Sequence, residues 1–203
     1  IATGIQQQLL AYQEPPPLEK SQVWIYNRPV ESIAGDYAEA FLDPEGNLVC
    51  YLFDVMGTGV SAALLGSDFP AAFRLGIKIH RDLSTIVNEI NRELTTILGD
   101  ITLFLTLAAF RISGDAEQPQ LEHVNCGHCP TLLTAKGASR SEEILPSGPP
   151  LGLFPEITYT SDIRTLPPET GILIVSDGCY EWKENDTLFG WDAFQALATS
   201  RIY

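Results

Sequence analysis

Three aspartates stand where an apolar run meets a glycine-containing turn, and their side chains could bind a cation. They are Asp36 after Gly35, Asp54 at the end of an apolar run, and Asp177 before Gly178. A carboxylate at a buried strand end is costly unless it is paired or bound to a cation. Carboxylate and backbone carbonyl oxygens are ligands that Mg²⁺ and Mn²⁺ prefer, and glycines let the backbone approach a ligand closely. Together, the three segments are compatible with a divalent-cation site.

Each segment taken alone has a simpler explanation, because Asp-Gly pairs are ordinary turn chemistry. The hypothesis of a cation site therefore also depends on the strands and helices that would position the three aspartates. Alternating apolar and β-branched residues predict strands over 22–30, 41–42, 48–53, 102–112, 121–125, 131–134, 159–163 and 171–175. Helical spacing predicts helices over 5–10, 60–75, 82–98 and 189–198, with Pro70 as a kink or break.

The order of these elements indicates the fold class. Two groups of strands surround one pair of helices, which favours antiparallel sheets with helices packed outside over alternating βαβ units. We therefore expect an α+β fold of two packed antiparallel β-sheets flanked by α-helices.

Seven short segments, in order along the chain, resemble the motifs of the type 2C (PPM) metal-dependent protein phosphatases in their bacterial SpoIIE/RsbU branch. Each motif alone is weak, but their shared order is strong evidence. The segments are AGDYAE at 34–39, DVMGTGVSAAL at 54–64, FLTL at 104–107, NCGHCPTLL at 125–133, PLGL at 150–153, SDGCYE at 176–181 and LFG at 188–190.

The resemblance implies an αββα sandwich and a serine/threonine phosphatase. It matches Asp36, Asp54 and Asp177 to the family's metal-binding aspartates, and Val55 to the residue that contributes a backbone carbonyl. Two ions, Mn²⁺ or Mg²⁺, are then expected, and such a pair activates a water for attack on phosphorus without a protein nucleophile.

Some features depart from the family pattern. No D-D-x-T motif, whose aspartate completes the family's metal site, follows Gly190. Either the printed sequence ends before that strand, or the protein lacks that ligand and is a catalytically impaired pseudophosphatase that binds a partner; both readings stay open. Ala34, Glu39 and Thr58 also differ from common family residues, and Glu39 and Thr58 could be tolerated variation at the surface or around the metals.

The cysteines suggest a second chemistry that we disfavour. Cys126 and Cys129 have the C-x-x-C spacing of a thiol–disulfide motif, but that motif needs a following helix, and here a strand follows. We interpret the segment as a hairpin turn, in which His128 could either approach the metal centre or bond within the turn. Cys50 and Cys179 lie in apolar runs and are expected to be buried.

Composition limits the partners and the location. The chain has 203 residues and a net charge of −14, so it would repel nucleic acid over most of its surface. The apolar stretch 101–110 is too short to span a membrane, and residues 1–4 do not begin a signal peptide, so we expect a cytoplasmic protein. The chain does not begin with methionine, which is compatible with a fragment.

The expected organisation is an N-terminal helix and proline-rich linker at 1–17 and a phosphatase-like domain at 18–203 that lacks the last family strand. The resemblance implies a phosphorylated anti-sigma-factor antagonist of the STAS type as substrate and an upstream sensor or receiver domain. In relatives the connecting helix can dimerise, so a homodimer formed through 5–10 is one expectation; an ordinary packed helix is the other.

Overall fold

The computed structural model describes residues 21–27, 35–57, 60–99 and 101–201. Its larger sheet has five antiparallel strands in the order β1-β2-β3-β4-β7. A second sheet has three antiparallel strands in the order β6-β5-β8, and β9 and β10 form a separate hairpin. The strand bounds are β1 Asp36–Leu42, β2 Leu48–Val55, β3 Leu105–Ser113, β4 Gln120–Cys126, β5 Thr131–Ala135, β6 Glu142–Ile144, β7 Asp162–Thr165, β8 Thr170–Leu173, β9 Lys183–Glu184 and β10 Thr187–Leu188.

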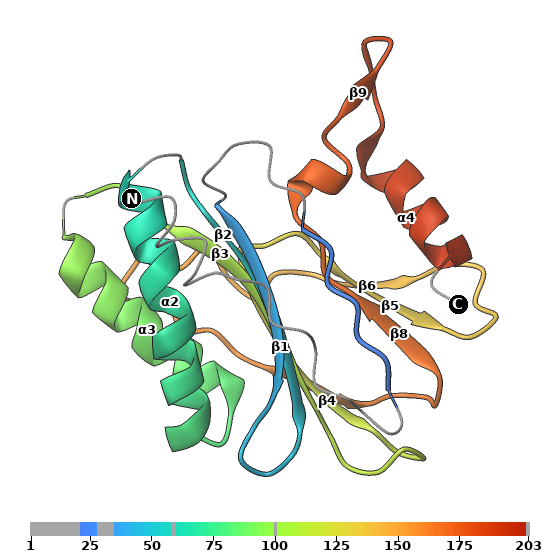
Figure 1. The fold of residues 1–203 in the computed structure, drawn as a ribbon, viewed down its shortest axis with the longest axis horizontal. Helices are drawn as coiled ribbons and strands as arrows, with labels where there is room; N and C mark the ends of the chain where they lie inside the picture. The colour runs from blue at the N-terminus through green and yellow to red at the C-terminus, as the bar shows by residue number, and fades with distance from the viewer. Residues whose placement is uncertain (1–20, 28–34, 58–59, 100, 202–203) are drawn as a thin grey trace.

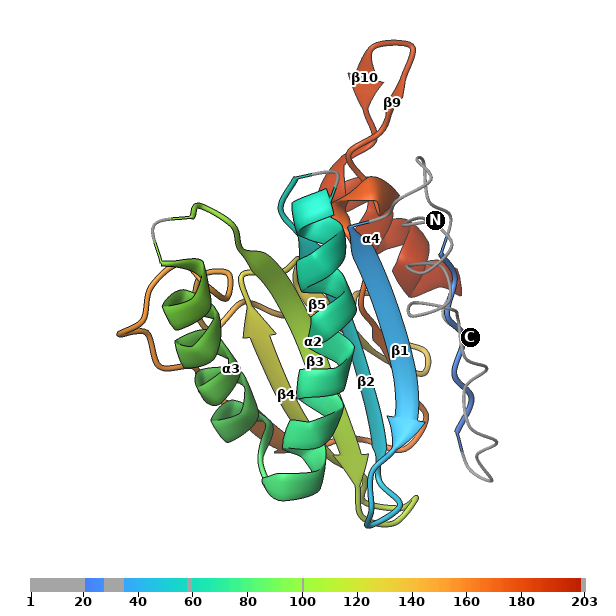
Figure 2. The same ribbon diagram turned by 60° about the vertical axis from the view of Figure 1, so that its left-hand side comes forward.

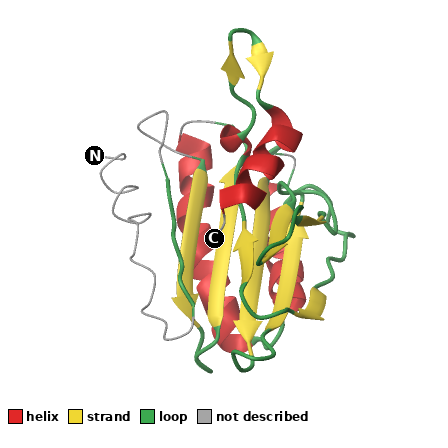
Figure 3. Cartoon of the chain, turned by 90° about the vertical axis from the view of Figure 1, so that its right-hand side faces the viewer, coloured by secondary structure: helices red, strands yellow, loops and turns green. Residues whose placement is uncertain are grey.

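Helices cover the outer faces of the sheets (Figure 1). Helices α2 (Val60–Ile79) and α3 (Leu83–Leu98) lie across one face of the larger sheet (Figure 2). Helix α4 (Gly190–Arg201) lies against the smaller sheet (Figure 3). Gln195 of this helix donates a hydrogen bond to the Glu143 carboxylate of β6 at 2.8 Å. The expected α+β arrangement of two antiparallel sheets flanked by helices is confirmed.

Two apolar cores follow from the alternation of side chains along each strand. Tyr51, Phe53 and Leu107 point toward α2 and α3 and belong to the larger core. Residues of opposite parity, such as Cys50 and Phe110, pack in a smaller core with residues of the second sheet. Even-numbered positions of β2 and β3 therefore face the second sheet.

Helix α3 begins where the sequence indicates. Asp82 is its N-cap and accepts a hydrogen bond from the Thr85 amide at 2.7 Å. Of the two alternatives expected at Pro70, a kink or a break, the break is wrong, because α2 continues through this residue. Phe69 and Phe73 on either side are 3% and 0% exposed, and their burial offsets the hydrogen bond that proline cannot donate.

The strand predicted over 22–30 is also wrong in its described part, since residues 21–27 have no regular secondary structure. Val23 and Ile25 pack against the core between the sheets, while Trp24 and Tyr26 are 80% and 84% exposed. The alternation correctly indicates which side chains face inward, but it does not provide a paired strand. Residues 28–30, and the helix expected over 5–10, lie outside the described residues.

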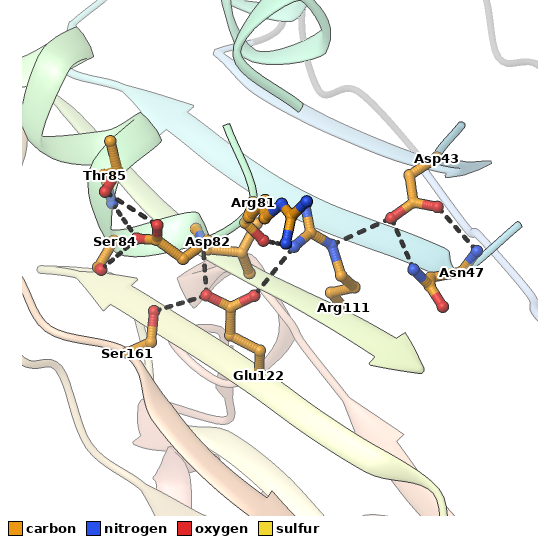
Figure 4. A network of polar contacts seen from close by, with 10 residues as sticks. Asp43, Asn47, Arg81, Asp82, Ser84, Thr85, Arg111, Glu122 and Ser161 are labelled. Carbon is orange, nitrogen blue, oxygen red and sulfur yellow. Dashed lines mark hydrogen bonds and ion pairs between the residues drawn. The ribbon is translucent and has the colours of Figure 1, made fainter. Parts of the chain in front are cut away.

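A buried arginine links strands of the larger sheet to helix α3 at the end where β1 turns into β2 (Figure 4). Nε of Arg111 on β3 lies 3.2 Å from a carboxylate oxygen of Asp43, and its Nη1 lies 3.2 Å from Glu122 on β4. Glu122 also accepts hydrogen bonds from the Leu83 amide at 2.5 Å and the Ser161 hydroxyl at 3.0 Å. These contacts join the sheet to the start of α3 at the end opposite Asp36 and Asp54.

Candidate metal centre

Asp36 and Asp54 lie side by side on neighbouring strands. Asp36 begins β1, and its Cα pairs in register with that of Asp54 near the end of β2. Asp54 pairs in turn with Thr106 on β3. Cross-strand partners project to the same face of a sheet, so these three side chains form one polar row facing the second sheet.

Asp177 reaches this row from another part of the chain. It begins the short 3-10 turn η1 (Asp177–Cys179), which follows β8 of the smaller sheet. The amides of Tyr180 and Glu181 donate to the Asp177 carbonyl at 2.9 and 2.8 Å, which closes the turn. Its carboxylate is exposed, and its charge acts on Asp54.

The three carboxylates change the acidity of Asp54. Burial, then the charges of Asp36 and Asp177, and a side-chain hydrogen bond with Asp36 raise the pKa of Asp54 to about 7. The hydrogen bond between two carboxyl groups requires a proton on one of them. Burial and the neighbouring negative charges thus disfavour the ionised form of Asp54, and a bound divalent cation would offset this effect.

Gly35 packs directly against the candidate oxygen ligands. The Val55 amide donates to the Gly35 carbonyl at 3.3 Å. A Cβ on residue 35 would lie 2.9 Å from Oδ1 of Asp54 and 3.1 Å from the carbonyl oxygen of Val55. The glycine is needed because two chain segments approach closely, a reason that the local sequence does not reveal.

Thr106 and His128 also belong to the site. From the sequence, Thr106 has no assigned role, and His128 has two alternatives, an approach to the metal centre or a hydrogen bond within its turn. His128 is 5% exposed, and its Nδ1 lies 2.7 Å from Oγ1 of Thr106. Burial lowers the pKa of His128 to about 4, against the opposing effects of Asp36, the Val175 backbone and Asp177. Its backbone amide also donates to Oδ1 of Asn125 at 2.8 Å, so both alternatives considered for His128 hold. The signal available in the sequence was that Thr106 lies in the FLTL segment and His128 in the NCGHCPTLL segment, both of which resemble family motifs.

The candidate ligands are carboxylate and carbonyl oxygens, which is the type of ligand that hard divalent cations prefer. In the part of the chain that the structure describes, no group of three or more His, Cys, Asp or Glu side chains is close enough to hold an ion as it stands. Asp36 and Asp54 are in register on neighbouring strands, and Asp177 is exposed on its turn.

A comparison with protein-family models decides the family. The model described as Stage II sporulation protein E (SpoIIE) matches residues 44–202. The chain belongs to the SpoIIE family. Asp54 and Asp177 lie inside the matched range and Asp36 precedes it, and the resemblance noted from the motifs is confirmed.

Two curated relatives are similar to this SpoIIE-family chain. Protein IcfG of Synechocystis sp. is 26% identical over 190 residues, which cover 80% of this chain and 29% of the relative. Phosphoserine phosphatase RsbP of Bacillus subtilis is 25% identical over 175 residues, which cover 81% of this chain and 43% of the relative. The chain thus spans less than half the length of either one.

Solved structures share the fold. The PP2C domain of SiaA from Pseudomonas aeruginosa superposes with a TM-score of 0.71 at 17% identity, covering 84% of this chain and 68% of that one. The RsbU and RsbW domains of Rv1364c from Mycobacterium tuberculosis give 0.65 at 23% identity, covering 85% and 47%. RsbX in complex with magnesium gives 0.54 at 19% identity, covering 86% and 82%.

Of the two departures interpreted as tolerated variation, the structure describes the surroundings of one. Glu39 is not a surface residue: it is 4% exposed, accepts a hydrogen bond from the Tyr51 hydroxyl at 2.6 Å, and pairs with Arg74 of α2. It projects toward the helices, away from Asp36, since the two positions have opposite parity along β1. Thr58 lies outside the described residues.

The thiols do not form a reactive pair. Burial raises the pKa of both the Cys126 and the Cys129 thiols, and the strand β5 follows instead of a helix, as expected. The expected hairpin turn is wrong, because β4 and β5 belong to different sheets. Cys50 is buried as expected, but Cys179 is exposed, since it lies on the η1 turn.

Proposed function

We propose that this chain is a divalent-cation-dependent phosphatase that acts on phosphoserine or phosphothreonine in proteins. One observation carries the proposal. Asp36 and Asp54 are in register, and burial together with the charges of Asp36 and Asp177 raises the pKa of Asp54 to about 7. A cluster of like charges that destabilises the cation-free protein is explained by a cation that it binds.

In this proposal the ligands are the carboxylates of Asp36, Asp54 and Asp177 and the carbonyl oxygen of Val55, and the ions are two Mn²⁺ or Mg²⁺. When bound, the ions supply an activated water and offset the charge on the phosphoryl oxygens. Gly35 keeps the Asp54 carboxylate and the Val55 carbonyl uncovered, since any side chain there would crowd both.

The wider role is also proposed. We infer a phosphorylated anti-sigma-factor antagonist of the STAS type as substrate, with a sensor or receiver domain upstream. Two similar proteins support this inference: Rv1364c carries an RsbU and an RsbW domain in one protein, and RsbP is named a phosphoserine phosphatase. No helix among the described residues is long and apolar enough to cross a membrane, and a cytoplasmic location stays a prediction.

The test is hydrolysis of p-nitrophenyl phosphate with and without Mn²⁺, followed by release of phosphate from phosphoserine, phosphothreonine and phosphotyrosine peptides. We expect Mn²⁺-dependent activity that falls at least about 100-fold in Asp54→Asn. Asp186→Asn is the control, because Asp186 lies exposed at the tip of the β9–β10 hairpin. If the folded wild-type protein hydrolyses none of these substrates, the enzyme proposal fails and the partner-binding pseudophosphatase takes its place.

A further inference from the structure

The hairpin of β9 and β10 projects from the body of the protein at the end of the sandwich where β1 begins and β2 ends (Figures 1 and 2). Residues 180–182 alone separate it from the η1 turn, which begins with Asp177. At its tip, Asn185 and Asp186 have φ +49° and +62°, which a tight two-residue turn of type I′ requires. The hairpin is therefore a regular two-stranded projection beside the candidate metal centre.

Trp182, at the base of the hairpin, is held in place although much of it faces solvent. Its indole Nε1 donates a hydrogen bond to the Cys179 carbonyl of η1 at 3.2 Å. Its ring stacks on Phe189, with the ring centres 4.7 Å apart and the planes inclined by 18°. The Phe189 amide also donates to the Trp182 carbonyl at 3.0 Å. Trp182 nevertheless stays 45% exposed, so it presents an aromatic surface whose orientation is already fixed.

The opposite face of the same hairpin carries a second exposed apolar side chain. Leu188 is 53% exposed and is the cross-strand partner of Lys183. Cross-strand partners project to one face, and successive residues of a strand alternate between faces. Trp182 and Phe189 therefore share one face, and Leu188 lies on the other. Of these two apolar surfaces, the one formed by Trp182 is hydrogen-bonded to η1.

An apolar contact beside the site would supply affinity that charge does not. The chain has a net charge of −14, and a phosphorylated partner brings further negative charge, so long-range electrostatics disfavour their association. Fixed, partly exposed tryptophans are frequent anchors of protein interfaces, because they bury a large area and lose little conformational freedom. Cys179 lies two residues after Asp177, so the indole Nε1 lies within roughly 10 Å of that aspartate, the span of about three extended residues.

We propose that the Trp182 face of the hairpin is the docking surface for the polypeptide segment that carries the phosphorylated residue. The surface takes an apolar side chain about three residues from the phosphoserine or phosphothreonine. The identity of the partner as a substrate rests on the proposed function, whereas the docking contact itself does not. Small phosphate esters have no such side chain and cannot use this surface.

The first test compares two synthetic phosphoserine peptides of equal length. One carries leucine three positions from the phosphoserine on both sides, and the other carries glycine there. With Mn²⁺, we expect wild-type kcat/KM to be about tenfold higher for the leucine peptide, mainly through a lower KM. Equal values for the two peptides would overturn the proposal, whatever the variants do.

The second test assigns this preference to one face of the hairpin. In Trp182→Ala, the ratio of kcat/KM for the leucine peptide to that for p-nitrophenyl phosphate should fall about tenfold. Leu188→Ala removes an apolar side chain of similar exposure from the opposite face and should leave the ratio within about twofold. An equal fall in both variants, or an unchanged ratio in Trp182→Ala, would overturn the proposal.

Amide hydrogen exchange at Phe189 shows whether the hairpin stays formed, because this amide donates to the Trp182 carbonyl. If the hairpin opens in Trp182→Ala, Trp182→Thr replaces it, since threonine favours strands and has no aromatic surface. A leucine preference that persists in a Trp182 variant with a formed hairpin would contradict the proposal.

A protein that hydrolyses neither peptide would refute the phosphatase, and peptide binding would then decide the docking surface. Fluorescence anisotropy of the labelled leucine peptide measures its dissociation constant. Binding about tenfold weaker in Trp182→Ala than in Leu188→Ala would support the docking surface without the enzyme. Equal dissociation constants in wild type and Trp182→Ala would refute the docking surface as well.

Discussion

Asp36 and Asp54 are cross-strand partners in register, although both are carboxylic acids. Such a pair does not stabilise a fold by itself, because burial and mutual repulsion both disfavour its ionised form. A bound divalent cation would offset this repulsion between the two carboxylates. Several measurable properties of the metal-free protein depend on this relationship.

Replacing Asp54 by asparagine should stabilise the metal-free protein at pH 8. The folded-state pKa of Asp54, about 7, lies above its ordinary value of 3.8. Between these values the folded chain holds a proton that the unfolded chain has lost, so the free energy of unfolding falls as the pH rises. Asparagine carries no charge and should gain about 1–3 kcal/mol at pH 8 and much less at pH 4.

Urea unfolding in EDTA at the two pH values measures this effect, with the exposed Asp186→Asn as the control. Added Mn²⁺ should stabilise the wild type but not Asp54→Asn. A variant less stable than wild type at pH 8 without metal would contradict the prediction.

Gly35→Ala should weaken Mn²⁺ binding by about tenfold or more. The new Cβ would lie 2.9 Å from Oδ1 of Asp54 and must displace that carboxylate or the Val55 carbonyl. Gly178→Ala is a matched control, because Gly178 also adjoins a candidate ligand but a Cβ there meets nothing within 4 Å. Isothermal titration compares the two, and equal affinities would show that Gly35 does not shape the site.

The free energy of unfolding should depend on His123 below pH 6.5. Burial lowers the pKa of His123 from 6.5 to about 4, with opposing effects from Asp162 and Arg164. In this interval the unfolded chain binds a proton that the folded chain does not, so this contribution is complete above pH 6.5 and is lost as the pH falls toward 4. Its slope approaches about 1.4 kcal/mol per pH unit.

His123→Gln removes this titration while keeping a hydrogen-bonding group near Thr131. Urea unfolding of wild type and variant at several pH values between 4 and 7 should give curves that converge as the pH falls, and the comparison cancels the other titrating groups. Parallel curves would mean that His123 takes up its proton in the folded state as readily as in the unfolded one.

Arg74→Met should destabilise the protein by about 2–3 kcal/mol, because it leaves the Glu39 carboxylate buried without its cation. Arg74 Nε donates to Glu39 at 3.1 Å, and its guanidinium lies 4.6 Å from the centre of the Phe41 ring. The double variant Glu39→Gln/Arg74→Met should recover part of the loss, since it removes the buried charge.

The pair Lys136–Glu169 is the control for this measurement. Its side chains are 60% and 63% exposed, and Lys136→Met should change stability by less than about 0.5 kcal/mol. Equal losses for the two methionine variants in urea unfolding would show that burial of Glu39 adds nothing to the ion pair.

The interior of the fold could be predicted well where local pattern decides it. Alternation identified most strands, and the helical spacing of apolar residues placed the start of α3 at Asp82, which the structure shows to be its N-cap. Prediction failed where contacts distant in the chain decide. Pro70 stays helical because Phe69 and Phe73 pack on the sheet, and residues 21–27 stay unpaired although they alternate.

The family and the three candidate aspartates could be read from the order of short motifs and from residue types, because both are local properties of the chain. The register of Asp36 with Asp54, the origin of the Asp177 turn after the second sheet, and the contact of His128 with Thr106 became visible only in the folded chain. Periodicity along a strand specifies which face a side chain occupies but not its neighbour. That neighbour is chosen by strand register and by the packing of one sheet on the other, which are properties of the whole chain.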